Sequence, residues 1–342
     1  MTILSILPAL VTGSKIEIDA KLSSKFVSSL PTVQTIYTQW FVQQKLKPFP
    51  VNHLACRDDE TKKSERVGAF FSGGVDAYYT LLKNMDIITD IIFIRGYDVK
   101  LEKKGMLDEG SELVKRVGKE FNKNVIEIET NARPFLDKFI TYGKSHGALL
   151  ASVAHLLTNQ IGTVLIPSAE TYANLIPDGT HPLLDPLWNS DKIEFIHDGN
   201  EASRLQKLKK ITTSQFVLDN LRVCFGKSES KLNCCKCEKC LRTMISLKLL
   251  GVLEKSNSFQ NDIDLKAIRK IDITPSRKIY HSELLWELDK HPQFNDISYE
   301  ISSLLFKPHL IKNNYILIKN YLRKLKYRLP KLYSMFSEHI KS

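Results

Sequence analysis

The stretch Val67-Gly-Ala-Phe-Phe-Ser-Gly-Gly-Val-Asp-Ala-Tyr-Tyr-Thr-Leu-Leu82 decides the fold. Its first five residues form an apolar run that suits a buried strand, and its last six have helical character. Between them, the glycines of Ser72-Gly-Gly-Val-Asp76 would let backbone amides approach an anion at a helix N-terminus. The aspartate would repel phosphate unless Mg²⁺ lay between the two. We therefore predict a phosphate-binding loop with Mg²⁺; a plain strand-to-helix turn is the alternative.

Further apolar runs alternate with helical segments after this stretch, which predicts a doubly wound, mainly parallel α/β sheet with helices on both faces. The predicted strands are residues 67–71, 90–95, 124–129 and 162–167, and the predicted helices include residues 110–121 and 147–159. Ligands of such sheets bind beyond the carboxyl ends of the strands. We therefore expect the functional residues directly after each strand.

Three parts are expected along the chain. Residues 1–66 predict a small N-terminal α+β unit, because short strand patterns flank a helical pattern and a highly charged stretch closes the segment. Residues 67–251 contain the predicted sheet and a group of cysteines. Residues 252–342 have apolar residues at helical spacing and predict a helical C-terminal extension that ends in a basic helix.

The net charge of the 342-residue chain is +11, and its 43% hydrophobic and 25% charged residues are ordinary for a globular protein. The charge is concentrated in residues 307–342, where nine basic residues and one acid give +8. The rest is nearly balanced, which argues against a general nucleic-acid coat. The basic helix could contact RNA or a membrane surface, but we favour a helix packed on the body with a solvated basic face.

Five of the six cysteines lie between Cys224 and Cys240. The ligands Cys224, Cys234, Cys237 and Cys240 have the spacing C-x9-C-x2-C-x2-C, and four thiolates complete a tetrahedral Zn²⁺ shell with a structural role. A disulfide or an iron–sulfur cluster is the alternative, and Cys235 could take the place of Cys234 as a ligand.

Crowded thiols suit a reducing compartment, and we expect a cytoplasmic protein. No apolar run is long enough for a transmembrane helix, and no basic region precedes the apolar N-terminus as in a secretory signal.

The loop Ser72-Gly-Gly-Val-Asp76 resembles the PP-loop of the ATP pyrophosphatase superfamily, except that Ala77 stands where the family has a serine. Together with the cysteines about 150 residues later, it resembles the 7-cyano-7-deazaguanine synthase family. The stretch 233–244 is also similar to a set of bacterial PP-loop proteins of unassigned reaction. The resemblance covers residues 67–251 and implies an adenine nucleotide alpha hydrolase-like fold.

The resemblance implies an ATP-dependent ligase that adenylates a substrate carboxylate, releases pyrophosphate and lets an amine displace AMP. The partners would be a small carboxylate and an amine, with ATP, Mg²⁺ and Zn²⁺ as cofactors. One alternative is a tRNA-modifying PP-loop enzyme, of thiolation or lysidine type, that uses the basic tail. Another is a nucleotide-binding module without turnover, since one phosphate-contacting hydroxyl is missing at Ala77.

Candidate site residues follow the strand ends and the helix starts. The expected nucleotide-binding residues are Ser72, Gly73, Gly74, Val75, Asp76, Arg95, Asp98, His146 and Ser168. The expected catalytic residues are Asp76, His181, Asp185 and Arg204, with Glu170 and Tyr172 as further substrate-loop candidates. His181 could be an acid or base near neutral pH, or merely a hydrogen-bonding group. Arg204 could neutralise phosphate, or form a surface ion pair with Glu201.

Overall fold

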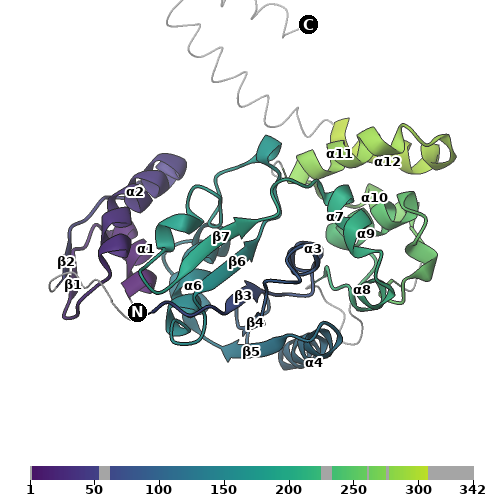
Figure 1. The fold of residues 1–342 in the computed structure, drawn as a ribbon. Helices are drawn as coiled ribbons and strands as arrows, with labels where there is room; N and C mark the ends of the chain where they lie inside the picture. The colour runs from purple at the N-terminus through teal and green to yellow at the C-terminus, as the bar shows by residue number, and fades with distance from the viewer. Residues whose placement is uncertain (1, 54–61, 225–232, 260–261, 275–276, 307–342) are drawn as a thin grey trace, which may run out of the picture. The chain divides into compact units, whose positions relative to one another are not determined.

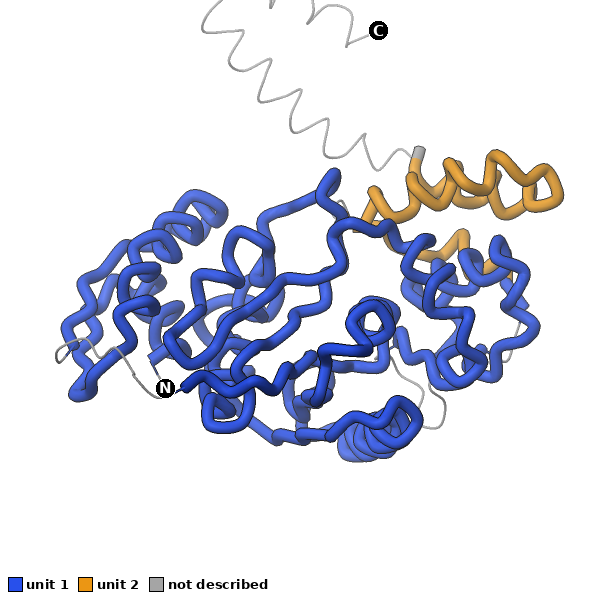
Figure 2. Tube along the Cα trace, viewed as in Figure 1, with its two compact units in different colours: residues 1–263 blue, residues 264–342 orange. Residues whose placement is uncertain are grey.

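The computed structural model describes residues 2–53, 62–224, 233–259, 262–274 and 277–306. The chain divides into two compact units, Met1–Ile263 and Asp264–Ser342 (Figure 2). The division into residues 1–66, 67–251 and 252–342 stays a prediction. The expected basic terminal helix lies outside the described residues.

A five-stranded sheet forms the centre of the first unit, in the order β5-β4-β3-β6-β7 (Figure 1). Each neighbouring pair is parallel. The strands are β3 Val67–Phe70, β4 Asp90–Arg95, β5 Asn124–Glu129, β6 Thr163–Pro167 and β7 Glu194–Asp198. The predicted α/β class with a parallel sheet is confirmed. The edge strand β7 was not predicted, because its five residues include only two apolar ones.

Both faces of the sheet are buried, as the alternation of side chains requires. Phe70, Ile92 and Val164 point into a core shared with α6 (Tyr142–Leu156). Their neighbours in sequence, such as Ala69 and Ile91, join a second core with α3 (Val75–Lys83) and α4 (Lys104–Glu120). Figure 1 shows α6 and the α3–α4 pair on different sides of the strands. The sheet is therefore covered by helices on both faces.

The N-terminal segment packs on the α6 face. Helix α1 (Thr2–Thr12) contacts α6 and buries Ile6, Leu7 and Leu10 in the core that also holds Phe70. The sequence analysis noted an apolar patch here but predicted no helix. The remaining elements of this segment are β1 Ile16–Ile18, α2 Ser24–Trp40, η1 Val42–Gln44 and β2 Val51–His53, with β1 and β2 paired in parallel.

The predicted start of the buried helix at residue 147 is wrong, because α6 begins at Tyr142. His146 lies in the second turn of α6 and does not open it. His197 lies in β7, and the following helix α7 (Arg204–Ile211) begins only at Arg204, after a cap at Ser203. The other elements of the unit are α5 Ala132–Leu136, η2 Tyr172–Asn174, η3 Asp185–Trp188, α8 Gln215–Asn220, α9 Glu238–Leu249 and η4 Leu253–Lys255.

The second unit is helical where it is described. Its elements are α10 Leu265–Arg269, α11 Lys278–Leu288, η6 Pro292–Phe294 and α12 Asn295–Phe306, with α12 packed against both α10 and α11. No helix in the described part of either unit has the length and apolar character needed to cross a membrane.

Candidate functional site

The 72–76 loop joins β3 to α3 at the point where the strand order reverses, since β4 lies on one side of β3 and β6 on the other. Gly73 has φ +79°, a left-handed conformation that suits glycine, and Gly74 is the N-cap of α3. A cavity of about 160 Å³ opens here. The loop therefore meets a helix N-terminus, a strand end and a cavity at the switch point of the sheet.

Five of the expected residues line this cavity together: Ser72, Gly74, Asp76, Asp98 and His146. They come from three separate segments of the chain. Their shared position agrees with the expectation that functional groups follow the carboxyl ends of the strands. The other expected residues, which do not line the cavity, are Gly73, Val75, Arg95, Ser168, His181, Asp185 and Arg204.

The wall beyond β4 combines an apolar surface with one carboxylate. Tyr97, Val99 and Leu107 supply apolar lining beside Asp98. The Tyr142 hydroxyl donates to Asp98 Oδ1 at 2.9 Å. The wall thus offers apolar side chains next to a carboxylate acceptor, which suits an aromatic group that carries a hydroxyl nearby.

Arg95 forms ion pairs with residues of β5 and α4 and does not line the cavity. Its Nε lies 3.0 Å from Glu129 and its Nη1 lies 3.0 Å from Asp108. A third hydrogen bond joins Nη1 to Ser111 Oγ at 2.8 Å. The guanidinium therefore ties β4 to β5 and α4.

Asp76 is held by two cations from α7. Arg204 Nη1 lies 2.6 Å from Asp76 Oδ2, and Lys207 Nζ lies 3.3 Å from Oδ1. Burial opposes ionisation of this carboxyl, but the charges and hydrogen bonds of Arg204 and Lys207 prevail and lower its pKa to about 2. The alternative pairing of Arg204 with Glu201 does not occur, because Glu201 accepts hydrogen bonds from Lys83 and Tyr79.

Lys207 was missed by the sequence analysis, although its side chain is only 1% exposed. Besides Asp76, its ammonium donates to Ser168 O at 2.6 Å. A signal was available: Ser203 and Gln206 form a capping box, which places Arg204 at the first helical position. Residues 204 and 207 then lie three apart and share a helix face.

Ser168 is buried behind this cluster and does not reach the cavity. Its hydroxyl donates to Glu170 O at 3.0 Å and accepts from Asn200 Nδ2 at 2.8 Å. Its carbonyl accepts from Lys207. Ser168 therefore fixes the loop after β6 and the ammonium of Lys207.

His181 and Asp185 belong to a second buried group. Asp185 Oδ2 lies 2.6 Å from His197 Nδ1, and burial raises the pKa of Asp185. His181 Nδ1 accepts the amide of Leu183 at 3.0 Å, and its ring packs edge-on against Trp40. The predicted catalytic residues are thus divided between this group and the Asp76 cluster, which consists of Asp76, Arg204 and Lys207.

His146 is the one histidine of the described residues that lines the cavity. Its ring packs against Tyr142 at a centroid distance of 4.9 Å. Burial lowers the pKa of His146 below its usual value, although the carboxylates of Asp98 and Asp185 oppose this. The imidazole is therefore neutral near pH 7 and can donate or accept a hydrogen bond in the cavity.

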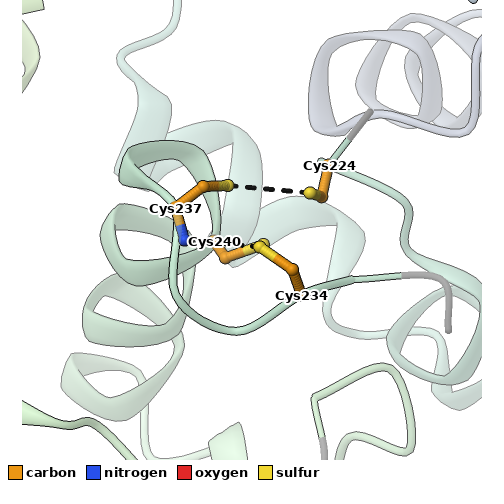
Figure 3. A group of neighbouring side chains, drawn as sticks. All are labelled: Cys224, Cys234, Cys237 and Cys240. Carbon is orange, nitrogen blue, oxygen red and sulfur yellow. Dashed lines mark hydrogen bonds between the residues drawn. The ribbon is translucent and has the colours of Figure 1, made fainter. Parts of the chain in front are cut away.

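The four predicted metal ligands come together in one cluster (Figure 3). The Sγ atoms of Cys224, Cys234, Cys237 and Cys240 all lie within 4.8 Å of one another. The closest pairs are Cys224–Cys237 at 3.7 Å and Cys234–Cys240 at 3.8 Å. A zinc–sulfur bond of about 2.3 Å in a tetrahedron requires sulfurs about 3.8 Å apart, whereas a disulfide requires about 2.05 Å. The cluster could hold a metal ion such as zinc.

The local backbone explains which cysteine stays outside the cluster. Cys235 has φ +56°, and this left-handed turn directs its sulfur toward Asn233 O at 3.8 Å instead. Cys237 then caps α9, and its amide donates to Cys234 Sγ at 3.3 Å. Cys234 and not Cys235 is therefore the fourth member.

A scan of the sequence against protein families finds no matching family. A search of curated proteins likewise finds none with significant similarity to this chain.

Proposed function

We propose that the chain binds Mg-ATP in the cavity beside the 72–76 loop and transfers AMP to the carboxylate of a small substrate, releasing pyrophosphate. An amine would then displace AMP, as the resemblance to PP-loop ATP pyrophosphatases implies. The observation that carries the proposal is the position of the loop. It places a glycine turn and a helix N-terminus in one cavity with Asp76, Asp98 and His146.

The strand order supports the finer fold that the resemblance implies. From the central β3 the chain adds β4 and β5 on one side, and then returns to add β6 and β7 on the other. Because all neighbouring strands are parallel, this order is the one expected of a doubly wound sheet and supports that class. We therefore propose an adenine nucleotide alpha hydrolase-like domain.

The proposed roles follow from the contacts. The amides at the start of α3 and the Ser72 hydroxyl would bind phosphate oxygens, while Tyr97 and Val99 would face the base. Mg²⁺, when bound, would neutralise phosphate charge beside Asp76. Arg204 and Lys207 now neutralise Asp76, and they would turn toward the phosphates as that carboxylate takes up the cation. Catalysis would consist mainly of positioning and charge neutralisation.

His181 and Asp185 take a different part in this proposal. Neither lines the cavity, so they would shape the loop that follows β6 rather than touch the nucleotide. His146, which lines the cavity, is instead the histidine that would contact a bound substrate.

The metal is proposed to be zinc with a structural role. Cys224, Cys234, Cys237 and Cys240 would fill a tetrahedral shell and leave no open position for a substrate.

A nucleotide-binding module without turnover is the second candidate, and one observation favours it. Ala77 is buried in the first turn of α3 and supplies no hydroxyl, so phosphate would be bound by backbone amides and Ser72. This candidate predicts ATP binding without product. The tRNA-modifying alternative depends on the basic tail, which lies outside the described residues.

The decisive experiment is incubation of the protein with Mg-ATP and candidate carboxylic acids, scored for AMP and pyrophosphate. We expect Asp76→Asn to lower turnover by about 100-fold or more, because the cation site and the counter-charge of Arg204 are lost together. Glu201→Gln is the matched control, since Glu201 also pairs with a lysine but lies outside the cavity. ADP and phosphate as products would refute the proposed AMP transfer. ATP binding without any product would support the nucleotide-binding module without turnover.

A further inference from the structure

The segment of residues 221–224 runs from the 72–76 loop to the cysteine cluster. We propose that Arg222 is a positioning residue through which metal binding at the cysteine cluster fixes the conformation of the 72–76 loop. The effect on nucleotide binding rests on the proposed function, whereas the effect on the loop itself does not.

The first link is a backbone hydrogen bond. The amide of Arg222 donates to Gly73 O at 2.8 Å. Gly73 is the left-handed residue of the loop, and a Cβ there would lie 2.7 Å from Leu113 Cδ2 and 3.4 Å from Arg222 Cβ. Arg222 therefore both donates a hydrogen bond to Gly73 and packs against it, at the left-handed position of the loop that favours glycine.

The second link is the side chain. Arg222 is only 2% exposed, yet it lines the cavity beside Ser72 and Asp76. Its Nη2 donates to Met106 O at 3.1 Å, and a Cβ at Gly110 would lie 2.7 Å from Nη1. Helix α4 therefore holds the guanidinium in place, and its position depends on where the backbone at 222 is fixed.

The third link ties the backbone to the cluster. Cys224, two residues after Arg222, supplies one of the four sulfurs. Asn233 Oδ1 accepts the amides of Val223 at 2.9 Å and Cys224 at 3.3 Å. Its Nδ2 donates to Leu221 O at 2.8 Å, and Asn233 directly precedes the ligand Cys234. Both the sulfur and the backbone of the segment are therefore attached to the metal-binding turn.

These links form one mechanical path. A metal ion holds Cys224 against the turn that carries Cys234, and the side chain of Asn233 binds the backbone of residues 221–224 to the same turn. Removal of the ion frees Cys224 from its three partners, so residues 221–224 can move away from Gly73. The loop then loses a hydrogen-bond donor and its packing neighbour, and the cavity loses a guanidinium.

Hydrogen exchange of the full chain tests the proposal without any nucleotide. The protein is compared with zinc bound and after removal of zinc by a chelator, by mass spectrometry of peptides that cover residues 72–78 and 221–223. We expect exchange in both peptides to rise about fivefold or more after zinc removal, the factor that corresponds to one backbone hydrogen bond. Peptides from α1 and α6, on the other face of the sheet, should not change. Equal exchange in the loop with and without zinc would overturn the proposal, and so would a uniform rise across the whole sheet.

Asn233→Ala provides an independent variant that keeps all four cysteines. With zinc content measured and equal to that of the parent protein, we expect faster exchange at residues 72–78. Unchanged exchange there would contradict the path. Cys235→Ser, one residue from a ligand but outside the cluster, should behave as the parent.

Nucleotide binding separates this inference from the proposed function. Zinc removal and Arg222→Lys should each weaken binding of Mg-ATP by about tenfold, measured by calorimetry. If the parent protein binds no ATP, the proposed function fails, whereas the exchange result still decides the coupling.

Discussion

At the scale of single residues, burial decides which charges the protein can use. The charges of Arg204 and of the buried Lys207 hold the pKa of Asp76 well below its usual value, against the effect of burial. Asp178 shows the opposite case. Burial raises its pKa to about 6, with the negative charges of Glu170 and Asp185 contributing, although the amide of Gly179 donates to it at 2.7 Å.

Asp178→Asn should therefore stabilise the protein in a pH-dependent way. The pKa of Asp178 is higher in the folded than in the unfolded state, so ionisation costs folding free energy as the pH rises from about 4 to 6. The asparagine oxygen can still accept the Gly179 amide. We expect a gain of about 1–3 kcal/mol at pH 7 and none near pH 4, measured by urea unfolding. Asp86→Asn, at an exposed position, should give no gain. A gain of equal size at both pH values would contradict the argument.

The sequence identified the residues of the loop and the cluster because they depend on local spacing. Ser72, Gly74 and Asp76 do line one cavity, and the four cysteines do converge. Lys207 and Arg222 were missed because their roles depend on contacts with residues more than a hundred positions away. His181 and Asp185 were expected with the others but lie in a separate buried group, since loop geometry cannot be inferred from strand order.

At the scale of elements, α7 carries both cations of the Asp76 cluster on one face. Its start is fixed by a capping box in which Ser203 Oγ accepts the Gln206 amide and Gln206 Oε1 accepts the Ser203 amide. The strand and helix pattern was predictable for buried parallel strands, which are continuous apolar runs. The pattern did not predict β7, an edge strand in which three of the five residues are polar, or α1, a run of apolar residues that contains Pro8.

Ser203→Ala should destabilise the first unit by about 1 kcal/mol, because the Gln206 amide at the start of α7 loses its side-chain acceptor. This corresponds to a fall in melting temperature of roughly 2–4 °C for a unit of this size. Ser203→Asp should retain most of the stability, since aspartate also caps a helix and suits its N-terminal dipole. Calorimetry of both variants provides the test. An aspartate variant as unstable as the alanine variant would exclude the capping explanation.

At the scale of the whole molecule, the cysteine cluster joins two segments near the C-terminal end of the first unit. Cys224 follows α8, and Cys237 and Cys240 begin α9. An ion shared by these segments would stabilise the folded state by mass action, by about 4 kcal/mol at a concentration a thousandfold above its dissociation constant.

We therefore expect one zinc ion per chain, and a fall of roughly 10 °C in melting temperature after chelation. Cys234→Ser should lose the metal and show the same fall. Cys235→Ser, the adjacent matched control, should keep both the metal and the melting temperature. Elemental analysis together with thermal unfolding measures both. Metal loss from the Cys235 variant but not the Cys234 variant would reverse the ligand assignment.

The contact between α1 and α6 has a consequence for synthesis on the ribosome. Helix α1 leaves the exit tunnel before the sheet, but the residues that bury Ile6, Leu7 and Leu10 include α6, which begins only at Tyr142. Until β3, β4, β5 and α6 have all emerged, this apolar helix has no folded surface to cover it. An uncovered helix of this kind is a binding site for chaperones and a nucleus for aggregation. Residues 2–12 therefore wait for much of the sheet, and we expect the N-terminal half of the unit to fold as one cooperative step rather than in the order of its synthesis.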